Sequence, residues 1–363
     1  MPDQSSARAF SAPPPPTPRR RSRLGCALLA ILLLIIAALA GGFMWLRASV
    51  NREVHHQAAD QVITVEPGMS TQAIINRLSA AGIVTDPTAL KIYLRITGGA
   101  SLRAGDYQFD SPTTPLAAID KIQRGLVYVE RVTIPEGYNR FDIAETLAAK
   151  TGKGTKEEFL RLTADQSPIM QIAPQARDLE GYLFPDTYNY NTKTTQAELI
   201  RAMVARFNEV FTPEWRARAR ELRMTIHEVV TLASIIEEEA RVPDERPRIS
   251  SVFHNRLKQG SPLGSDPTFI YAAILAGDYD GNPNQPRHRQ RDSRYNTYIY
   301  AGLPPGPIAS PGRASLEAAL YPEQTDYLYF VVSGTEGRHK FSRTAAEHDL
   351  AVQEYRRQQR EQR

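Results

Sequence analysis

The chain has 363 residues, 42% of them hydrophobic, which is enough material for more than one packed domain. Its 44 basic residues exceed its 40 acidic residues by four, and five arginines fall within the first 23 positions, so no basic surface for nucleic acid is expected. The single cysteine, Cys26, excludes an internal disulfide framework and a metal cluster held by several cysteines.

Residues 1–23 are rich in proline, serine and arginine, which predicts a disordered tail. Residues 24–46 follow as a predicted transmembrane helix, because positions 25–46 carry no charge and a helix of that length crosses roughly 30 Å of hydrocarbon. The arginines before this run predict that the short N-terminus lies on the inner, cytoplasmic side of the membrane and the bulk of the chain outside. A cleaved signal peptide is the alternative, since Ala38-Leu39-Ala40 resembles a cleavage site. The long apolar run and Trp45, a plausible interface anchor, favour an uncleaved anchor.

A polar connector is expected at residues 47–60, followed by an internal repeat. The segment from Val62 and the segment from Arg131 align at an offset of 69, which pairs Gly68 with Gly137 and reads in both as strand, turn and helix. A second helix capped by Asp86 and a strand near "GDYQF" complete residues 61–130. This β-α-α-β order resembles the LysM-like glycan-binding fold; chance recurrence of a common unit is the alternative.

Residues 131–363 mix helices with short strands, which predicts a mixed α+β domain and the α+β fold class. Helices are expected at 141–150, 155–163, 195–210, 213–222, 225–241, 246–258, 267–276, 313–320 and 343–357. The alternating run "TDYLYFVV" (325–332), a glycine-containing turn and "HKFS" predict a hairpin.

The stretch "HEVVTLASIIEEEARVP" (227–243) ends an apolar helix with three glutamates. At 100° per residue, Glu237 falls on the apolar stripe, Glu238 joins a polar face with His227 and Ser234, and Glu239 lies on a mixed flank. Burial of a carboxyl group favours its neutral form, which keeps the proton available at neutral pH for a general acid. The alternative is a helix-end glutamate paired with Arg241 or Arg246.

Other chemistries are not supported by the sequence. It contains no S-x-x-K tetrad and no G-x-S-x-G elbow, which argues against the serine enzymes that use them. The "HEVVT" segment lacks the second histidine of a zinc helix, and "DYDGNPNQPRHR" (278–289) has Arg289 where a calcium loop needs a glutamate. No metal and no cofactor are therefore expected.

Six segments in order resemble the endolytic murein transglycosylases of bacteria. They are "LEGYLFPDTY" (179–188), "LASIIEEEA" (232–240), "SVFHNRL" (251–257), "SDPTFIYA" (265–272), "YNTYIYAGLPPGPIASPG" (295–312) and "YLYFVV" (327–332). The resemblance covers roughly residues 60–357. It implies an inner-membrane anchor, a LysM-like subdomain, and a catalytic glutamate at the first position after "ASII", which is Glu237. Glu238 departs from the pattern, because many relatives carry a basic residue there.

The resemblance also implies the reaction, which is cleavage of the β-1,4 bond between N-acetylmuramic acid and N-acetylglucosamine without water. Glu237 would protonate the glycosidic oxygen and then deprotonate the muramic C6 hydroxyl as it closes on C1, giving a 1,6-anhydro end. Nascent peptidoglycan strands would be the substrate, and strand termination the outcome. Coupling to peptidoglycan synthases of the penicillin-binding class is a further implication that no residue specifies.

Seven further residues match family positions and are predicted to bind substrate. They are Glu180, Asp186, Tyr188, Asn255, Asp266, Tyr295 and Asn296. Two of these residues have a purely structural alternative. Asp266 precedes Pro267 and suits a helix N-cap, and Asn255 would form hydrogen bonds with a neighbouring loop. Two rival functions are a hydrolytic muramidase, in which Asp186 or Asp266 activates water, and a non-enzymatic peptidoglycan-binding scaffold.

Overall fold

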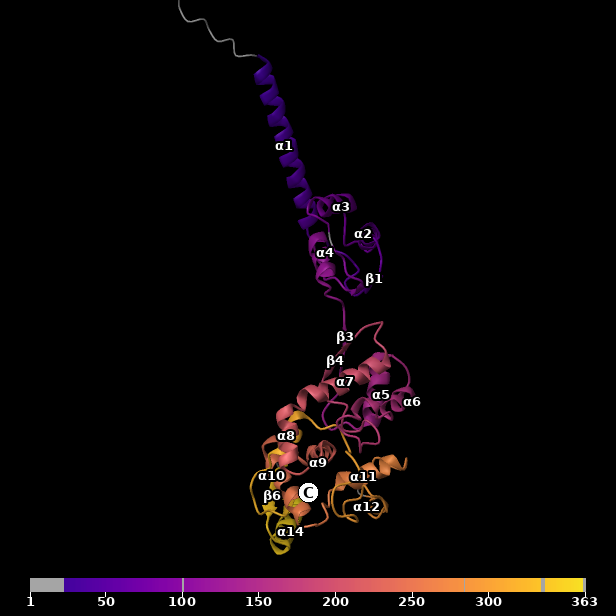
Figure 1. Cartoon of the computed structure of the whole chain (residues 1–363), viewed down its shortest axis with the longest axis vertical. Coiled ribbons are helices and arrows are strands. Elements are labelled where there is room, and N and C mark those ends of the chain that lie inside the picture. Colours follow the sequence, from indigo (N-terminus) through magenta and orange to yellow (C-terminus); the bar gives the residue numbers. More distant parts are fainter. Residues whose placement is uncertain (1–22, 100, 284, 334–336, 362–363) are drawn as a thin grey trace, which may run out of the picture. The chain divides into compact units, whose positions relative to one another are not determined.

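The structure is a computed structural model that describes residues 23–99, 101–283, 285–333 and 337–361. The chain divides into two compact units, residues 1–128 and residues 129–363 (Figure 1). Each unit has its own buried hydrophobic core. The predicted disordered tail, residues 1–23, lies outside the described residues except for Arg23.

The first helix, α1 (Arg23–Asn51), is long and apolar enough to cross a membrane. Its side chains are exposed along most of the described length, but Leu46 and Val50 are only 4% and 1% exposed, where α1 contacts α3 (Pro87–Ile96). The helix therefore runs unbroken through the first five residues of the expected connector, residues 47–60, and ends inside the core of the first unit.

The rest of the first unit is small. Strands β1 (Ile63–Val65) and β2 (Gly105–Tyr107) pair antiparallel, and α2 (Thr71–Ala80) and α3 come between them in the chain. The expected cap on α3 is present, since Asp86 accepts the N–H of Ala89 at 2.9 Å. A further helix, α4 (Pro115–Arg124), was not predicted, although Thr114 at its cap and Pro115 in its first turn are ordinary start signals.

The internal repeat is visible in the backbone. Gly68 and Gly137 take nearly the same left-handed φ, 80° and 81°, in the turn that follows each strand. Ser70 and Asn139, again 69 positions apart, cap the helices that follow. The aligned apolar residues of both copies, Ile74, Ile143, Leu78 and Leu147, are all buried. The same strand–turn–helix unit is therefore used once in each core.

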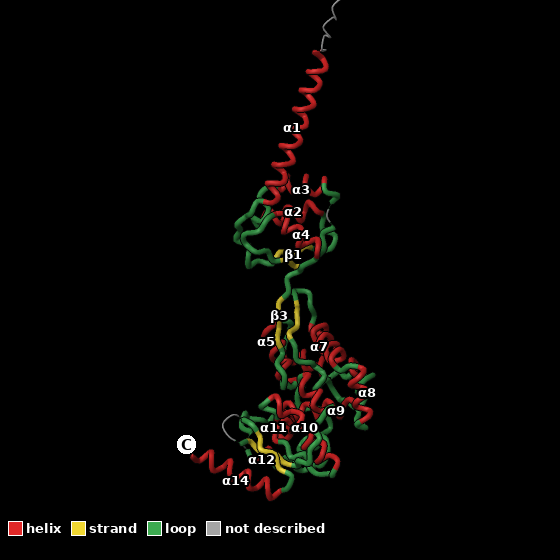
Figure 2. The backbone as a smooth tube through the Cα atoms, turned by 90° about the vertical axis from the view of Figure 1, so that its left-hand side faces the viewer, coloured by secondary structure: helices red, strands yellow, loops and turns green. Residues whose placement is uncertain are grey.

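The second unit holds two antiparallel strand pairs among many helices (Figure 2). Strand β3 (Glu130–Thr133) pairs with β4 (Thr187–Tyr190), and β5 (Tyr329–Val332) pairs with β6 (His339–Ser342), which confirms the predicted hairpin. The helices are α5 (Arg140–Thr151), α6 (Lys156–Thr163), α7 (Gln196–Val210), α8 (Pro213–Glu221), α9 (Ile226–Glu239), α10 (Arg246–Lys258), α11 (Asp266–Leu275), α12 (Pro286–Arg289), α13 (Arg313–Leu320) and α14 (Ala345–Glu361), with short 3-10 turns η1 (Ser167–Ile169) and η2 (Pro243–Glu245). The predicted α+β class is confirmed, and the predicted helix ends hold within two residues except at α14.

Helix α9 lies at the centre of this unit and contacts α8, α10, α11 and α13. Thr225 caps it and forms a capping box with Glu228. One prediction about α9 is wrong: the side expected to be a polar face, which carries His227 and Ser234, is buried like the apolar side. A loop covers that side, and the hydroxyl of Ser234 accepts the N–H of Ile308 at 3.1 Å.

Candidate active site

Glu237 lies in the last turn of α9, and its side chain is 7% exposed. One carboxylate oxygen accepts a hydrogen bond from Nη2 of Arg246 at 3.0 Å. The other accepts the backbone N–H of Gly312, just before α13, at 2.9 Å. The side chain is thus withdrawn from solvent and held from two directions. The alternative of a paired arginine correctly identified Arg246 as its contact.

A second carboxyl group lies beside this pair. Glu136, in the turn between β3 and α5, is 4.0 Å from the same Nη2 atom of Arg246 and is half exposed. Burial and the charge of Glu237 raise the pKa of Glu136, and Arg246 opposes them. Sequence reasoning missed Glu136. The available signal was its place next to Gly137, in a turn that the internal repeat had already identified.

The two other glutamates have different surroundings. Ser265 donates its hydroxyl to Glu239 at 2.6 Å, and burial raises the pKa of Glu239 to about 7 despite that bond. Glu238 is the most exposed of the three. Partial removal from water, followed by the charges of Glu237, Glu239 and Asp142, raises the pKa of Glu238 to about 7. The three neighbours are therefore chemically distinct.

Two surface hollows meet at Glu238. The first, of about 710 Å³, is lined by Glu136, Glu238 and the exposed side of α5. The second, of about 870 Å³, is lined by Glu238, Glu239, Asp266 and the β5–β6 hairpin, among others. Glu136, which shares Arg246 with Glu237, lines the first hollow. Glu238, the residue after Glu237, lines both hollows.

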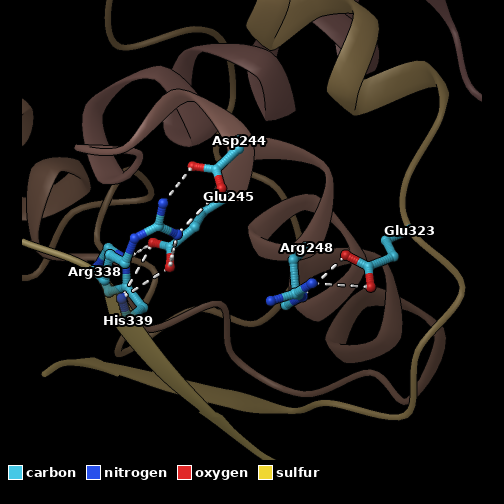
Figure 3. A network of polar contacts seen from close by, with 6 residues as sticks. All are labelled: Asp244, Glu245, Arg248, Glu323, Arg338 and His339. Carbon is cyan, nitrogen blue, oxygen red and sulfur yellow. Dashed lines mark hydrogen bonds and ion pairs between the residues drawn. The ribbon is translucent and has the colours of Figure 1, made fainter.

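Polar contacts, of which that between Glu245 and His339 is buried, fix the hairpin wall of the second hollow (Figure 3). Glu245, at the end of η2, accepts the backbone N–H of His339 at 3.1 Å and contacts its Nδ1 at 2.8 Å. Arg338 pairs with Asp244 at 3.1 Å. These contacts tie β6 to the short connection between α9 and α10, so the hairpin is positioned directly from the helix end that carries Glu237.

Three of the predicted substrate-binding residues make their contacts inside the protein. Tyr188 donates its hydroxyl to the carbonyl of Phe184 at 2.5 Å. The side-chain amide of Asn255 donates to the carbonyls of Thr325 and Tyr327, as the loop-satisfying alternative proposed. Asn296 is fully buried. Its amide donates to the carbonyls of Arg289 and Arg291, at 2.8 and 2.9 Å.

Glu180 is also interior, with 2% of its surface exposed. Its carboxylate accepts the N–H of Arg140 at the start of α5 and the hydroxyl of Tyr271 at 2.7 Å. Burial raises the pKa of Glu180 to about 8, against the opposing effect of those hydrogen bonds. This group joins the start of α5 to α11.

Three predicted residues retain surface. Asp186 pairs with Arg206 at 2.8 Å on the exterior. Asp266 lines the second hollow and accepts the hydroxyl of Tyr298 at 2.5 Å. The N-cap alternative for Asp266 is wrong, because Ser265 holds the cap position and Asp266 is the first helical residue. Tyr295 is partly buried, and its ring centroid lies 5.2 Å from that of Tyr271.

Comparison with known proteins identifies the family to which the chain belongs. The model of the YceG-like family matches residues 63–354, which spans both units. The chain belongs to the YceG-like family. The match includes the turn that carries Glu136, the end of α9 and the start of α13, so all the parts of the candidate site lie within the family region.

Relatives share roughly a third of their residues with the chain. A Bacillus subtilis protein named endolytic murein transglycosylase is 32% identical over 341 residues, covering 87% of this chain and 91% of its own. A protein of the same name from Streptococcus pneumoniae is 30% identical over 325 residues, and the match spans 58% of its length. A crystal structure of a putative YceG-like protein from Listeria monocytogenes is 32% identical, with a TM-score of 0.56 over 80% of this chain and 99% of that one.

Proposed function

We propose that the chain is an endolytic murein transglycosylase with Glu237 as its catalytic residue. The observation that carries the proposal is a carboxyl group at the end of a core helix that is only 7% exposed, while its neighbours Glu136 and Glu238 line two surface hollows. Membership of the YceG-like family and the name shared by its relatives support the reaction class. The substrate is the glycan strand of nascent peptidoglycan, and cleavage within it would end strand growth.

The reaction needs one group that is first an acid and then a base. Neutral Glu237 donates its proton to the oxygen of the bond between N-acetylmuramic acid and N-acetylglucosamine, and that bond to C1 breaks. The resulting carboxylate accepts the proton of the muramic C6 hydroxyl while the oxygen of that hydroxyl bonds to C1. The proton returns to Glu237, no water is consumed, and the product carries a 1,6-anhydro end.

The contacts of Glu237 in this structure match the second half of that cycle. A guanidinium at 3.0 Å and a backbone N–H at 2.9 Å are both donors, so each oxygen of Glu237 accepts a hydrogen bond, as the oxygens of a carboxylate do. The same contacts hold the two oxygens in a fixed orientation, which a base needs in order to accept a proton from one defined hydroxyl. The first half of the cycle requires the Arg246 contact to weaken.

Digestion of purified glycan strands by the detergent-solubilised full chain tests the proposal. Wild type should release products with anhydro ends, which are one water (~18 Da) lighter than reducing ends, whereas Glu237→Gln should fold and release nothing. Reducing ends from the wild type would identify a hydrolytic muramidase, and Glu136 is a nearby carboxyl for such a reaction. Full function of Glu237→Gln in cells would favour a non-enzymatic scaffold.

The domain assignments are part of the proposal. Residues 1–23 form a cytoplasmic tail and residues 24–46 a single inner-membrane span, with a connector at 47–60, a LysM-like subdomain at 61–130 and a periplasmic catalytic domain at 131–363. The apolar length of α1 and the β-α-α-β order of residues 63–107 support this scheme. Fusions of a periplasm-dependent reporter after residue 10 and after residue 361 test the topology, and activity only in the second is expected.

Peptidoglycan synthases are the proposed partners, because termination of a strand requires access to it as it is made. Among the seven predicted substrate-binding residues, Asp266 and Tyr295 are the ones we favour for direct contact with glycan. Asp266 lines the second hollow, and Tyr295 is only partly buried. Glu180, Asp186, Tyr188, Asn255 and Asn296 make protein contacts that shape the surrounding backbone.

A further inference from the structure

We propose that Glu136 is a positioning residue that takes Arg246 away from Glu237 during the acid step. This inference rests on the proposed function, because it concerns how one glutamate is neutral in the first half of the reaction and charged in the second. Arg246 bound to Glu237 favours only the charged state. A second carboxylate within reach of the same guanidinium provides an alternative partner for the cation.

The geometry suits such an exchange. Nη2 of Arg246 is 3.0 Å from Glu237 and 4.0 Å from Glu136, a difference of 1.0 Å. The Nε of Arg246 donates to the hydroxyl of Ser315 at 3.0 Å, which anchors the guanidinium while its Nη2 lies within 4.0 Å of both carboxylates. The arginine side chain is 11% exposed, so water competes weakly for it. A small rotation about the anchored nitrogen changes its partner.

Gly312 shows that the position of Glu136 is built into the site. The φ of Gly312 is −74°, which any residue adopts, so backbone conformation does not require glycine here. The available space does require glycine, because a Cβ atom at this position would lie 1.9 Å from Oε1 of Glu136. The carboxyl of Glu136 therefore rests on the same glycine whose N–H binds Glu237. One backbone position holds both acids next to the arginine.

The remaining charges around the pair do not replace Glu136. Glu238, on the same helix, faces the first hollow together with Asp142 of α5. From α11, Asp266 is bonded to Tyr298 and acts on Glu239. The backbone just before helix α13 presents the uncharged N–H of Gly312, and among the described residues helix α8 makes no ion pair with Glu237. Arg246 and Glu136 are the charged groups that converge on Glu237 from other elements.

The exchange follows the proton. While Glu237 holds its proton, Glu136 is the only anion of the pair, and Arg246 is attracted to it. Once the proton has moved to the glycosidic oxygen, Glu237 is an anion and Arg246 returns to it, which is the arrangement in this structure. When the C6 hydroxyl gives its proton back to Glu237, the starting state is restored with no net change in charge.

The test is the pH–rate profile for release of anhydro ends from purified glycan strands by the full chain. In Glu136→Gln the arginine has no second carboxylate, so the catalytic proton is lost more easily. The alkaline limb should move to lower pH by about one unit, with about a tenfold loss of turnover above it and a small change in KM. Glu136→Asp, which keeps the charge, should restore most of the wild-type profile.

Two further variants separate this effect from a general disturbance. Gly312→Ala keeps the N–H that binds Glu237 but displaces the flexible end of Glu136, so it should shift the profile in the same direction. Glu221→Gln is the matched control, because Glu221 is an exposed glutamate at the end of α8 that pairs with Arg218 at 2.7 Å and lines neither hollow. Its profile should remain that of the wild type.

An unchanged alkaline limb in both Glu136→Gln and Gly312→Ala overturns the inference. So does complete loss of turnover in Glu136→Gln and Glu136→Asp alike, since that identifies a direct or structural role for Glu136. Thermal unfolding of each variant shows whether it folds. If Glu136→Gln does not fold, the alkaline limb of Gly312→Ala decides whether the inference holds. Absence of anhydro ends from the wild type is a separate result, which refutes the proposed function itself.

Discussion

Glu180 offers the most quantitative test of how the interior of the second unit is assembled. It was predicted to bind substrate, yet its carboxyl is 2% exposed and contacts Arg140 and Tyr271. The pKa of Glu180 is raised to about 8 from an ordinary value of 4.5, with burial as the main cause. A group with these properties links the stability of the fold to pH.

The sign and size follow from that pKa. Between pH 4.5 and 8 the folded chain keeps a proton on Glu180 that the unfolded chain releases, so stability falls as pH rises through this window. The contribution is complete below 4.5 and lost above 8. A difference of about 3.5 pKa units, at about 1.4 kcal/mol per unit, corresponds to roughly 5 kcal/mol as an upper limit.

Urea unfolding of the detergent-solubilised chain at pH 5 and pH 8 measures this contribution. The chain has two tryptophans, so a Trp45→Phe background leaves Trp215 as a reporter of the second unit. In Glu180→Gln, a neutral isostere, the loss of stability between the two pH values should shrink by several kcal/mol. Glu145→Gln, at an exposed carboxyl, should leave it unchanged. Equal pH dependence in Glu180→Gln and wild type would refute the reasoning, and a large loss of turnover at pH 5 without loss of stability would restore the substrate-binding prediction.

Three other predictions concern single contacts. Asn255→Ala removes two hydrogen bonds to the carbonyls before β5 and should cost about 1–3 kcal/mol in the free energy of unfolding, with normal turnover per folded molecule. Gly137→Ala should destabilise the second unit by more than Gly68→Ala destabilises the first. Both glycines have a left-handed φ, but a Cβ added at Gly137 would also lie 2.9 Å from Glu238, whereas one added at Gly68 meets nothing. Denaturation curves test both. Asp266→Asn should raise KM for glycan several-fold with the melting temperature unchanged; an unchanged KM would remove Asp266 from the substrate surface.

Local patterns predicted most of the elements in this chain. Helix starts at Asp86, Thr195 and Thr225 are marked by side chains that cap the backbone within three residues, so the signal and the structure lie side by side. The internal repeat was predictable for the same reason, since its turn glycines and apolar spacing are local. Helix α4 was not predicted, although Thr114 and Pro115 give start signals of the same local kind.

The contacts of the candidate site were less predictable because they join distant segments. The position of Glu237 followed from its own helix, and Arg246 was among the partners expected for it, but Glu136 and Gly312 come from distant stretches of chain. Periodicity identifies which face of a helix is apolar and does not identify what covers the opposite face. The family resemblance compensated for this at Glu237, where it selected the same residue as the helical pattern, and it gave no indication of Glu136.

The buried polar side of α9 has a specific cause in the loop of residues 302–312. This loop reads as a surface connection, but most of it is buried, and a buried backbone needs partners for its polar groups. Its four prolines remove four N–H donors. Of those groups that remain, the carbonyl of Pro305 contacts Nε2 of His227 at 3.0 Å, and the N–H of Ile308 donates to Ser234.

The same loop joins the two sides of the candidate site. The N–H of Ser310 donates to the carbonyl of Tyr138 at 2.8 Å, and the N–H of Gly137 donates to the carbonyl of Ser310 at 3.0 Å. Two residues later, the loop delivers the N–H of Gly312 to Glu237. Ser234→Ala should therefore do more than remove one hydrogen bond: with Ile308 left unsatisfied in the interior, at a cost of about 1–3 kcal/mol, the loop loosens and turnover falls along with stability. A stable Ser234→Ala variant with full turnover would show that the catalytic geometry does not depend on this loop.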